Sequence, residues 1–200
     1  MLNKVKFHTT GKKIIVAVFL LIISRQISAQ NLSSEQPVLN KLNNFYVDLV
    51  GKAATLNGNW GLFGGMRAGY NINERISIGL AGYGLIPDNL GGSYINQNGH
   101  DTLHFGYGGV ETTYSYQLSE KFNLGGTMML GAGRVDYENL GGNDYFFIME
   151  PGVALNFIIT NWFGLGYSVN YRLSSGVNYA DFSNASFSGW SMDLDFNFGF

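Results

Sequence analysis

The stretch GWSMDLDFNFGF at residues 189–200 decides the fold. Its large apolar side chains fall on alternate positions, and every position between them is polar or glycine. Successive side chains of a β-strand point to opposite faces, so the stretch predicts a strand with one apolar face and one polar face. The apolar face consists of Trp190, Met192, Leu194, Phe196, Phe198 and Phe200, and the opposite face consists of Gly189, Ser191, Asp193, Asp195, Asn197 and Gly199.

The same alternation continues upstream as far as Phe45. It predicts eight strands, at 45–56, 60–72, 75–86, 104–117, 121–136, 145–159, 161–173 and 188–200. Most of these exceed the roughly 9–11 residues that a tilted strand needs to cross a bilayer. Phe63 and Ile148 are exceptions, because the alternation places each of them on the polar face.

The connections between these strands alternate in length. Tight turns are predicted at 73–75, 118–121 and 160–161, and longer Gly-, Asn-, Asp- and Ser-rich segments at 87–103, 137–144 and 174–187. The connection at 57–59 is the one short connection predicted on the side of the longer segments. Short turns on one side and longer loops on the other are typical of outer-membrane barrels.

The composition agrees with a membrane barrel. Charged residues make up only 13% and aromatic residues 15% of the 200 residues, and outside the N-terminus no apolar run is long enough for a helical span. A closed β-barrel is the other structure that can cross a bilayer. A soluble calyx or sandwich has the same alternation, but aromatic residues near strand ends and a polar face rich in glycine and poor in lysine favour the membrane.

Residues 1–29 have the features of a secretory signal peptide. Lys4, Lys6, Lys12 and Lys13 precede an apolar core of ten residues, Ile14–Ile23, which is too short to span a bilayer. We therefore predict cleavage before Gln30, an uncleaved anchor being the alternative. Residues 30–44 would form a periplasmic lead-in and 45–200 the barrel.

Charge and cysteine content exclude several classes of partner and site. Cleavage would remove five of the 12 basic and none of the 14 acidic residues, which leaves a net charge of about −7. This charge argues against a nucleic-acid partner, because the phosphate backbone requires a basic patch. The absence of cysteine excludes disulfides and thiolate metal sites.

Residues 45–200 resemble the OmpA/OmpX-like family of small outer-membrane β-barrels. The resemblance rests on the terminal strand and on a hairpin formed by EPGVAL (150–155) and TNWFGLG (160–166). It implies an eight-stranded antiparallel up-and-down barrel in the outer membrane of a Gram-negative cell, with membrane lipid and the barrel-assembly machinery as partners. The terminal strand is similar to the signal that this machinery recognises, which implies that role for Trp190, Phe196, Phe198 and Phe200. No catalytic motif accompanies the resemblance, and the peptidoglycan-binding domain of longer OmpA-type proteins is not expected.

The alternation places eight charged side chains inside the barrel, and buried charges must pair or hydrogen-bond. They are Asp48, Lys52, Arg67, Glu111, Glu150, Arg172, Asp193 and Asp195. Because the last strand pairs with the first in a closed barrel, Asp193 or Asp195 is expected to meet Lys52, and Arg172 to be their other partner. The set predicts a rigid polar plug, or alternatively a narrow ion or proton path.

Two further regions carry weaker hypotheses. His100, Asp101 and His104 suggest a lipid-A-modifying enzyme or a metal site, but no serine follows at a deacylase-like spacing and no helix aligns the histidines. Segments 87–103 and 174–187 carry Tyr, Asn and Ser side chains suited to surface recognition, including Tyr94, Asn96, Gln97, Asn98, Tyr179, Asp181, Phe182, Asn184 and Phe187. The sequence thus predicts a non-enzymatic barrel without metal or cofactor, in a structural or surface-interaction role. A low-conductance channel is the first alternative.

Overall fold

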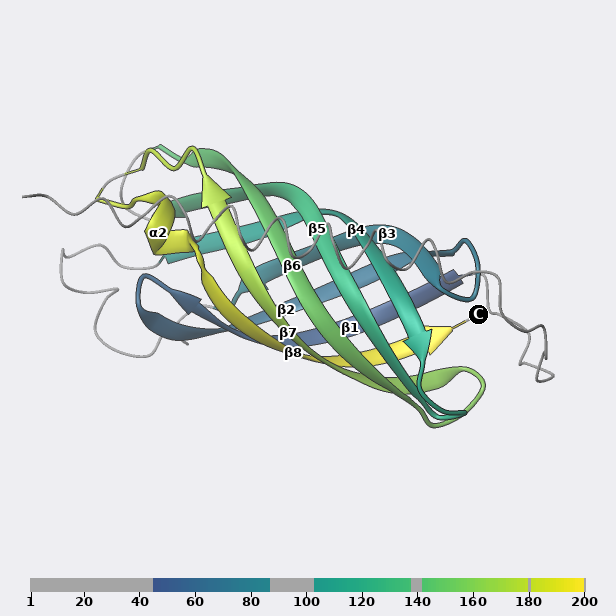
Figure 1. Ribbon diagram of the computed structural model, residues 1–200. Coiled ribbons are helices and arrows are strands. Elements are labelled where there is room, and N and C mark those ends of the chain that lie inside the picture. The colour runs from purple at the N-terminus through teal and green to yellow at the C-terminus, as the bar shows by residue number, and fades with distance from the viewer. Residues whose placement is uncertain (1–44, 87–102, 138–141, 180, 200) are drawn as a thin grey trace, which may run out of the picture. The chain divides into compact units, whose positions relative to one another are not determined.

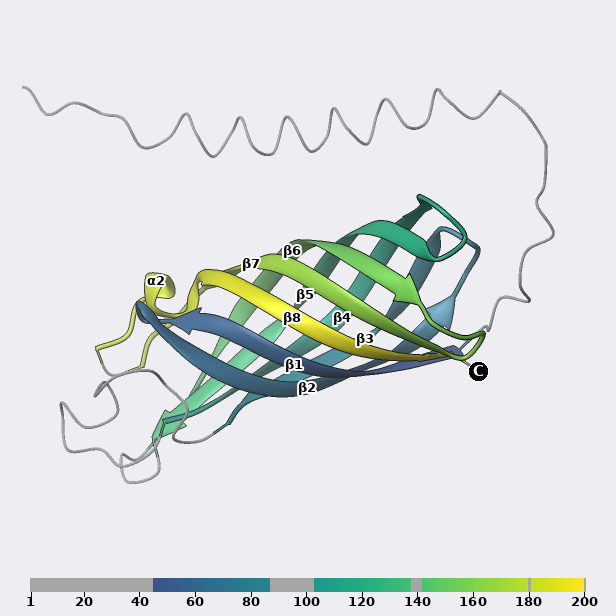
Figure 2. The ribbon, with the colours of Figure 1, turned by 90° about the horizontal axis from the view of Figure 1, so that it is seen from below.

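Eight antiparallel strands form a closed barrel in the computed structural model, which describes residues 45–86, 103–137, 142–179 and 181–199. Each strand pairs with the next in the chain, and β8 closes the barrel against β1 (Figures 1 and 2). The strands are β1 Phe45–Leu56, β2 Asn59–Asn71, β3 Ile76–Leu85, β4 Leu103–Gln117, β5 Phe122–Tyr137, β6 Asp144–Ile158, β7 Phe163–Ser175 and β8 Gly189–Gly199. This confirms the predicted fold, and every described boundary lies within two residues of its predicted position. None of the helices in these described ranges is long and apolar enough to cross a membrane.

Three tight turns gather at the end of the barrel where β1 begins and β8 ends, which we name the turn end (Figure 1). In the first of them, the Asn73 side chain accepts hydrogen bonds from the backbone N–H groups of Arg75 and Ile76, both at 2.8 Å. In the last turn, between β6 and β7, Thr160 Oγ1 accepts a hydrogen bond from the backbone N–H of Phe163 at 3.0 Å. Asn and Thr side chains favour turns by such bonds to the backbone that follows them.

The opposite end, the loop end, has one two-residue hairpin, between β1 and β2. Asn57 and Gly58 have φ angles of 47° and 81°. Positive φ at both central residues is the geometry of a type I′ turn, which explains the Asn-Gly sequence. A four-residue helix, α2 (Asn184–Phe187), precedes β8 at this end (Figure 2).

The exterior is apolar, as the alternation predicted. On every strand the exposed large hydrophobic side chains stand on one face, for example Leu62 and Met66 on β2 and Leu194 and Phe196 on β8. Pro151 also lies on the outer face of β6, where the ladder to β7 has a gap, consistent with the missing N–H of proline.

The interior is not polar throughout, which corrects the simplest form of the prediction. Phe63 and Ile148, the two exceptions in the sequence pattern, belong to a buried hydrophobic core that fills the loop-end half of the barrel. The segment 174–187 is also more than a surface loop, because Tyr179, Phe182 and Phe187 are buried. Recognition of a surface ligand by these three side chains is therefore wrong as a prediction.

Candidate functional site

The charged groups predicted from the sequence all lie inside the barrel, where each of the eight is buried. The strand register explains how they meet. Asp48 of β1 stands opposite Arg67 of β2, and Lys52 of β1 stands opposite Asp193 of β8. Two ionic layers result, one around Arg67 and one around Lys52.

The layer nearer the turn end is built on the Arg67 guanidinium, which contacts three carboxylates. Arg67 Nη2 lies 2.6 Å from Asp195 Oδ2, Nη1 lies 3.2 Å from Glu111 Oε1, and Nε lies 3.4 Å from Asp48 Oδ2. These carboxylates come from β8, β4 and β1, so the cluster connects strands across the lumen. The contact of Arg67 Nη1 with Glu111 Oε1 is a hydrogen bond, and a hydrogen bond between charged groups is stronger than a neutral one.

The second layer is built on Lys52, whose side chain is fully buried. Its ammonium lies 2.5 Å from Glu150 Oε1, 3.4 Å from Asp193 Oδ2 and 3.0 Å from the Tyr107 hydroxyl. It also stands 3.8 Å from the centre of the Tyr83 ring, a cation–π distance. Glu150 belongs to β6, on the opposite wall, so this ion pair crosses the lumen.

Neutral side chains complete the second layer. Asn170 Nδ2 donates to Asp193 Oδ2 at 2.9 Å and to Ser168 Oγ at 3.2 Å, and Ser191 Oγ donates to Glu150 Oε1 at 3.3 Å. A low-dielectric interior makes each satisfied bond valuable and each unsatisfied group costly. The layer therefore holds β6, β7 and β8 in one register around Lys52.

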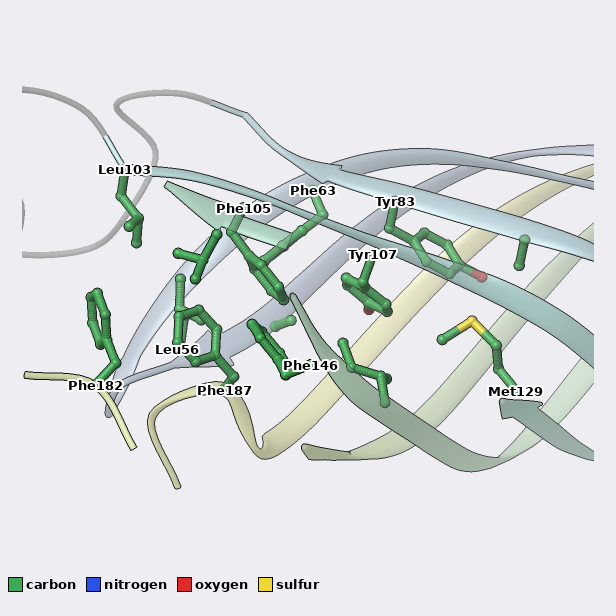
Figure 3. Packing of buried hydrophobic residues seen from close by; sticks show 14 of the residues in the cluster. Leu56, Phe63, Tyr83, Leu103, Phe105, Tyr107, Met129, Phe146, Phe182 and Phe187 are labelled. Atoms are coloured by element: carbon green, nitrogen blue, oxygen red, sulfur yellow. The ribbon is translucent and has the colours of Figure 1, made fainter. Parts of the chain in front are cut away.

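Beyond Lys52, toward the loop end, the lumen is filled by aromatic rings (Figure 3). Phe187 of α2 is completely buried, with its ring centre 4.8 Å from that of Phe146 and 4.9 Å from that of Phe105. Phe182 packs on Phe187 at 5.1 Å. The helix thus inserts an aromatic plug into the mouth of the barrel.

Arg172 fastens this plug and makes no ion pair with Asp193 or Asp195, so that part of the prediction is wrong. Its Nε donates to the Phe187 carbonyl at 2.7 Å, and its Nη2 donates to the Thr55 carbonyl at 2.8 Å. The guanidinium centre lies 5.0 Å from the Tyr107 ring centre. Arg172 stands opposite Gly189 on β8, four residues from Asp193, or about 13 Å along the strand.

The aromatic plug was missed because α2 has no strand period. The buried hydrophobic core did leave a trace in the sequence. Phe63 and Ile148 interrupt the polar face, and both lie toward the loop end of their strands. Two interruptions at the same end of a barrel indicate a local core.

The other proposed sites have less structural support. His104 lies on the outer face of β4 opposite Asp136 of β5, and among the described residues no hydrogen bond or ion pair connects it to a serine or a carboxylate. His100, Asp101 and the recognition residues of segment 87–102 lie outside the described residues, as do residues 1–44 and Phe200. No group of three His, Asp or Glu side chains suited to a metal occurs in the described part of the chain.

The described residues of the terminal strand divide between the outer face and the turn end. Trp190 and Phe196 are exposed on the outer face of β8. Phe198 is half-buried and packs on Phe163, with ring centres 5.3 Å apart. Their expected role in assembly stays a prediction.

Comparison with known proteins bears on the fold alone. No family model and no curated protein matches the sequence. Among solved structures, the chain is similar to the N-terminal β-barrel domain of OprF from Pseudomonas aeruginosa, with 15% identity and a TM-score of 0.55 over 80% of this chain and 98% of that one. It is also similar to Neisserial surface protein A (NspA), with 15% identity and a TM-score of 0.61 over 78% of this chain and 97% of that one. The chain therefore has the fold of the small eight-stranded outer-membrane β-barrels, the OmpA/OmpX-like architecture that its sequence predicted.

Proposed function

We propose that this protein is a non-enzymatic outer-membrane β-barrel with a closed lumen, in a structural or surface-interaction role. The proposal rests mainly on the contrast between the two sides of the barrel wall. The outer side carries exposed apolar chains such as Leu80 and Val153, whereas the inner side carries ion pairs and a hydrophobic core. Lipid requires an apolar wall with every backbone group paired within the barrel.

Exposed aromatic side chains near both ends support a membrane position. They are Phe45, Tyr70, Tyr114, Tyr116 and Trp162 toward the turn end, and Trp60, Tyr145 and Trp190 toward the loop end. Such belts are typical of the two membrane–water interfaces. On the described strands the only Asp, Glu, Lys or Arg side chains at outward-facing positions are Arg134 and Asp136, near the loop end of β5.

The closed lumen favours this role over a channel. A conducting path needs continuous water, but Lys52–Glu150 and Arg67–Glu111 cross the lumen and the aromatic core follows beyond them. An eight-stranded barrel is just wide enough for side chains to fill its interior. The lipid-A-modifying alternative depends on His104, for which no serine or carboxylate in hydrogen-bond or ion-pair contact occurs within the described ranges.

The test uses the full chain expressed in a Gram-negative host. We expect the protein in the outer-membrane fraction, with a different gel mobility before and after boiling, and no steady current when the purified barrel is inserted into a planar bilayer. A protein that stays monomeric and soluble without detergent would contradict the membrane assignment. Sustained single-channel currents would contradict the closed lumen and favour the channel.

Expression of the full chain in the same host also tests two predictions about biogenesis. We propose that residues 1–29 direct export and are removed, so the mature protein begins at Gln30, as N-terminal sequencing would detect. We also propose that the apolar face of the terminal strand engages the barrel-assembly machinery. Replacing Phe196 by Ser should lower the amount of heat-modifiable protein in the outer membrane. The matched change Asn197→Ser, at the neighbouring inward position, should not.

A further inference from the structure

A polar chamber of about 300 Å³ occupies the turn end of the barrel. Its floor is the Arg67 cluster, and Thr160 and Trp162 of the last turn line its mouth. Most of the strand side chains on its walls are neutral and polar, among them Ser77, Thr113, Ser115, Asn123, Thr127, Asn156 and Asn197. The chamber is therefore reached from the turn end, and the Lys52 layer and the aromatic core close it from the other side.

The floor of this chamber carries more negative than positive charge. Asp48, Glu111 and Asp195 share the single guanidinium of Arg67, which leaves two negative charges when all four groups are ionised. The Lys52 layer offers no surplus positive charge, because its one ammonium already faces the carboxylates of Glu150 and Asp193. Arg172 is committed to two backbone carbonyls at the loop end.

The Asp195 carboxylate at the floor receives no hydrogen bond from the described residues on either oxygen. Asp195 is 1% exposed and lines the chamber, and its Oδ1 has no partner among the described residues. Its Oδ2 makes an ion-pair contact with Arg67 Nη2 at 2.6 Å but likewise has no hydrogen bond within the described residues, and neither has Arg67 Nε. Leaving a buried charged acceptor unpaired is costly, and a donor that brings positive charge removes both the missing bond and the excess charge.

We propose that the chamber binds a small cation with N–H donors, an ammonium ion or a protonated primary amine, against Asp195 at its floor. The N–H groups would supply the donor that Oδ1 lacks, and the wall hydroxyl and amide oxygens would accept the remaining hydrogens. A metal ion is a poorer match, since no group of three acidic or His ligands suited to a metal occurs in the described ranges. This proposal does not depend on the surface role proposed above.

The experiment measures thermal unfolding of the full barrel in detergent at fixed ionic strength. Methylammonium is the probe, and tetramethylammonium is the control cation, because it has the same charge but no N–H donor. We expect methylammonium to raise the unfolding midpoint saturably, as a ligand specific for the folded state does, and tetramethylammonium and sodium to have little effect. Equal shifts with all three cations would reduce the effect to charge screening and overturn the proposal.

Variants then locate the site. Asp195→Asn should abolish the methylammonium shift, and Asp136→Asn, which changes an acidic residue on the outer face, should leave it unchanged. If Asp195→Asn does not fold, Glu111→Gln provides the same test at the other side of Arg67, with at least a tenfold loss of methylammonium affinity expected by calorimetry. A full shift in the Asp195→Asn barrel, or unchanged affinity in Glu111→Gln, would overturn the proposal.

Discussion

In the loop-end half of the barrel the interior is an apolar core closed by Phe187, whereas in the turn-end half it is a polar chamber above Arg67. The same eight strands and the same alternation produce both halves. Aromatic rings fill the first and stabilise it by burial, although Nη1 of Arg172 has no hydrogen-bond partner there among the described residues. The second keeps water-accessible polar walls, so it is the half that can exchange a ligand with solvent.

Lys52 marks the boundary between these halves. Its ammonium faces Glu150 and Asp193, and its side chain lies against the rings of Tyr83 and Tyr107. A small barrel thus contains two kinds of interior in series, separated by the ionic layer of Lys52, Glu150 and Asp193. Substituting Lys52 should affect both halves, so this change has the largest expected effect on stability.

Lys52→Met should destabilise the barrel by about 3–5 kcal/mol, because it leaves two buried carboxylates without their cation. The free energy of unfolding in urea, followed by tryptophan fluorescence in detergent micelles, measures the loss. Lys121→Met, an exposed turn residue at the chamber end, is the matched control and should change stability by less than about 0.5 kcal/mol.

A second variant separates charge from packing at this boundary. The double change Lys52→Met with Glu150→Gln removes one of the two orphaned charges and should recover part of the lost stability, since neutral replacements of a buried ion pair are often tolerated. If the double variant is no more stable than Lys52→Met, the loss reflects packing around the lysine stem and the ionic boundary is not the stabilising element.

Phe187→Ala tests the closed end and should cost about 3 kcal/mol, near the low end for a buried phenylalanine because a four-residue helix at the barrel mouth can relax. Phe147→Ala is the matched control, since Phe147 adjoins Phe146 but points outward. Unfolding in urea compares the two. Equal losses would mean that the plug contributes no more to stability than an aromatic ring on the outer face.

The strands could be predicted from sequence because a closed barrel gives every strand one outward face and one inward face. That constraint repeats every two residues, so β1 was predicted without error and the turns were marked by Asn73 and Thr160. The inward positions also predicted that Lys52 meets Asp193 or Asp195 once β8 is paired with β1, and the observed register selects Asp193.

Whether a residue occupies an odd or an even position in its strand predicts whether its side chain points inward or outward. It does not predict the position of that side chain along the barrel axis or its partner across the lumen. Arg172 points inward as expected, yet it lies too far toward the loop end to reach Asp193. The pairing of Lys52 with Glu150 joins strands that are not neighbours, so no ladder predicts it. The burial of Phe182 and Phe187 follows from tertiary packing of an irregular segment, where no period exists to be recognised.

Thr160→Ala tests the open end and should have the smallest effect, about 1 kcal/mol, because it removes the Thr160 Oγ1 bonds to the backbone N–H groups of Trp162 and Phe163. The turn is exposed, so hydrogen bonds from these N–H groups to water replace part of the lost stabilisation. Thr160→Ser keeps the hydroxyl and should retain most of the stability. Faster hydrogen exchange at the Phe163 amide in Thr160→Ala, with unchanged exchange in β5 and β6 near Phe146, would show that the open end loosens independently of the closed end. Coupled changes at both ends would mean that the halves unfold as one unit, and that their contrast in composition has no counterpart in dynamics.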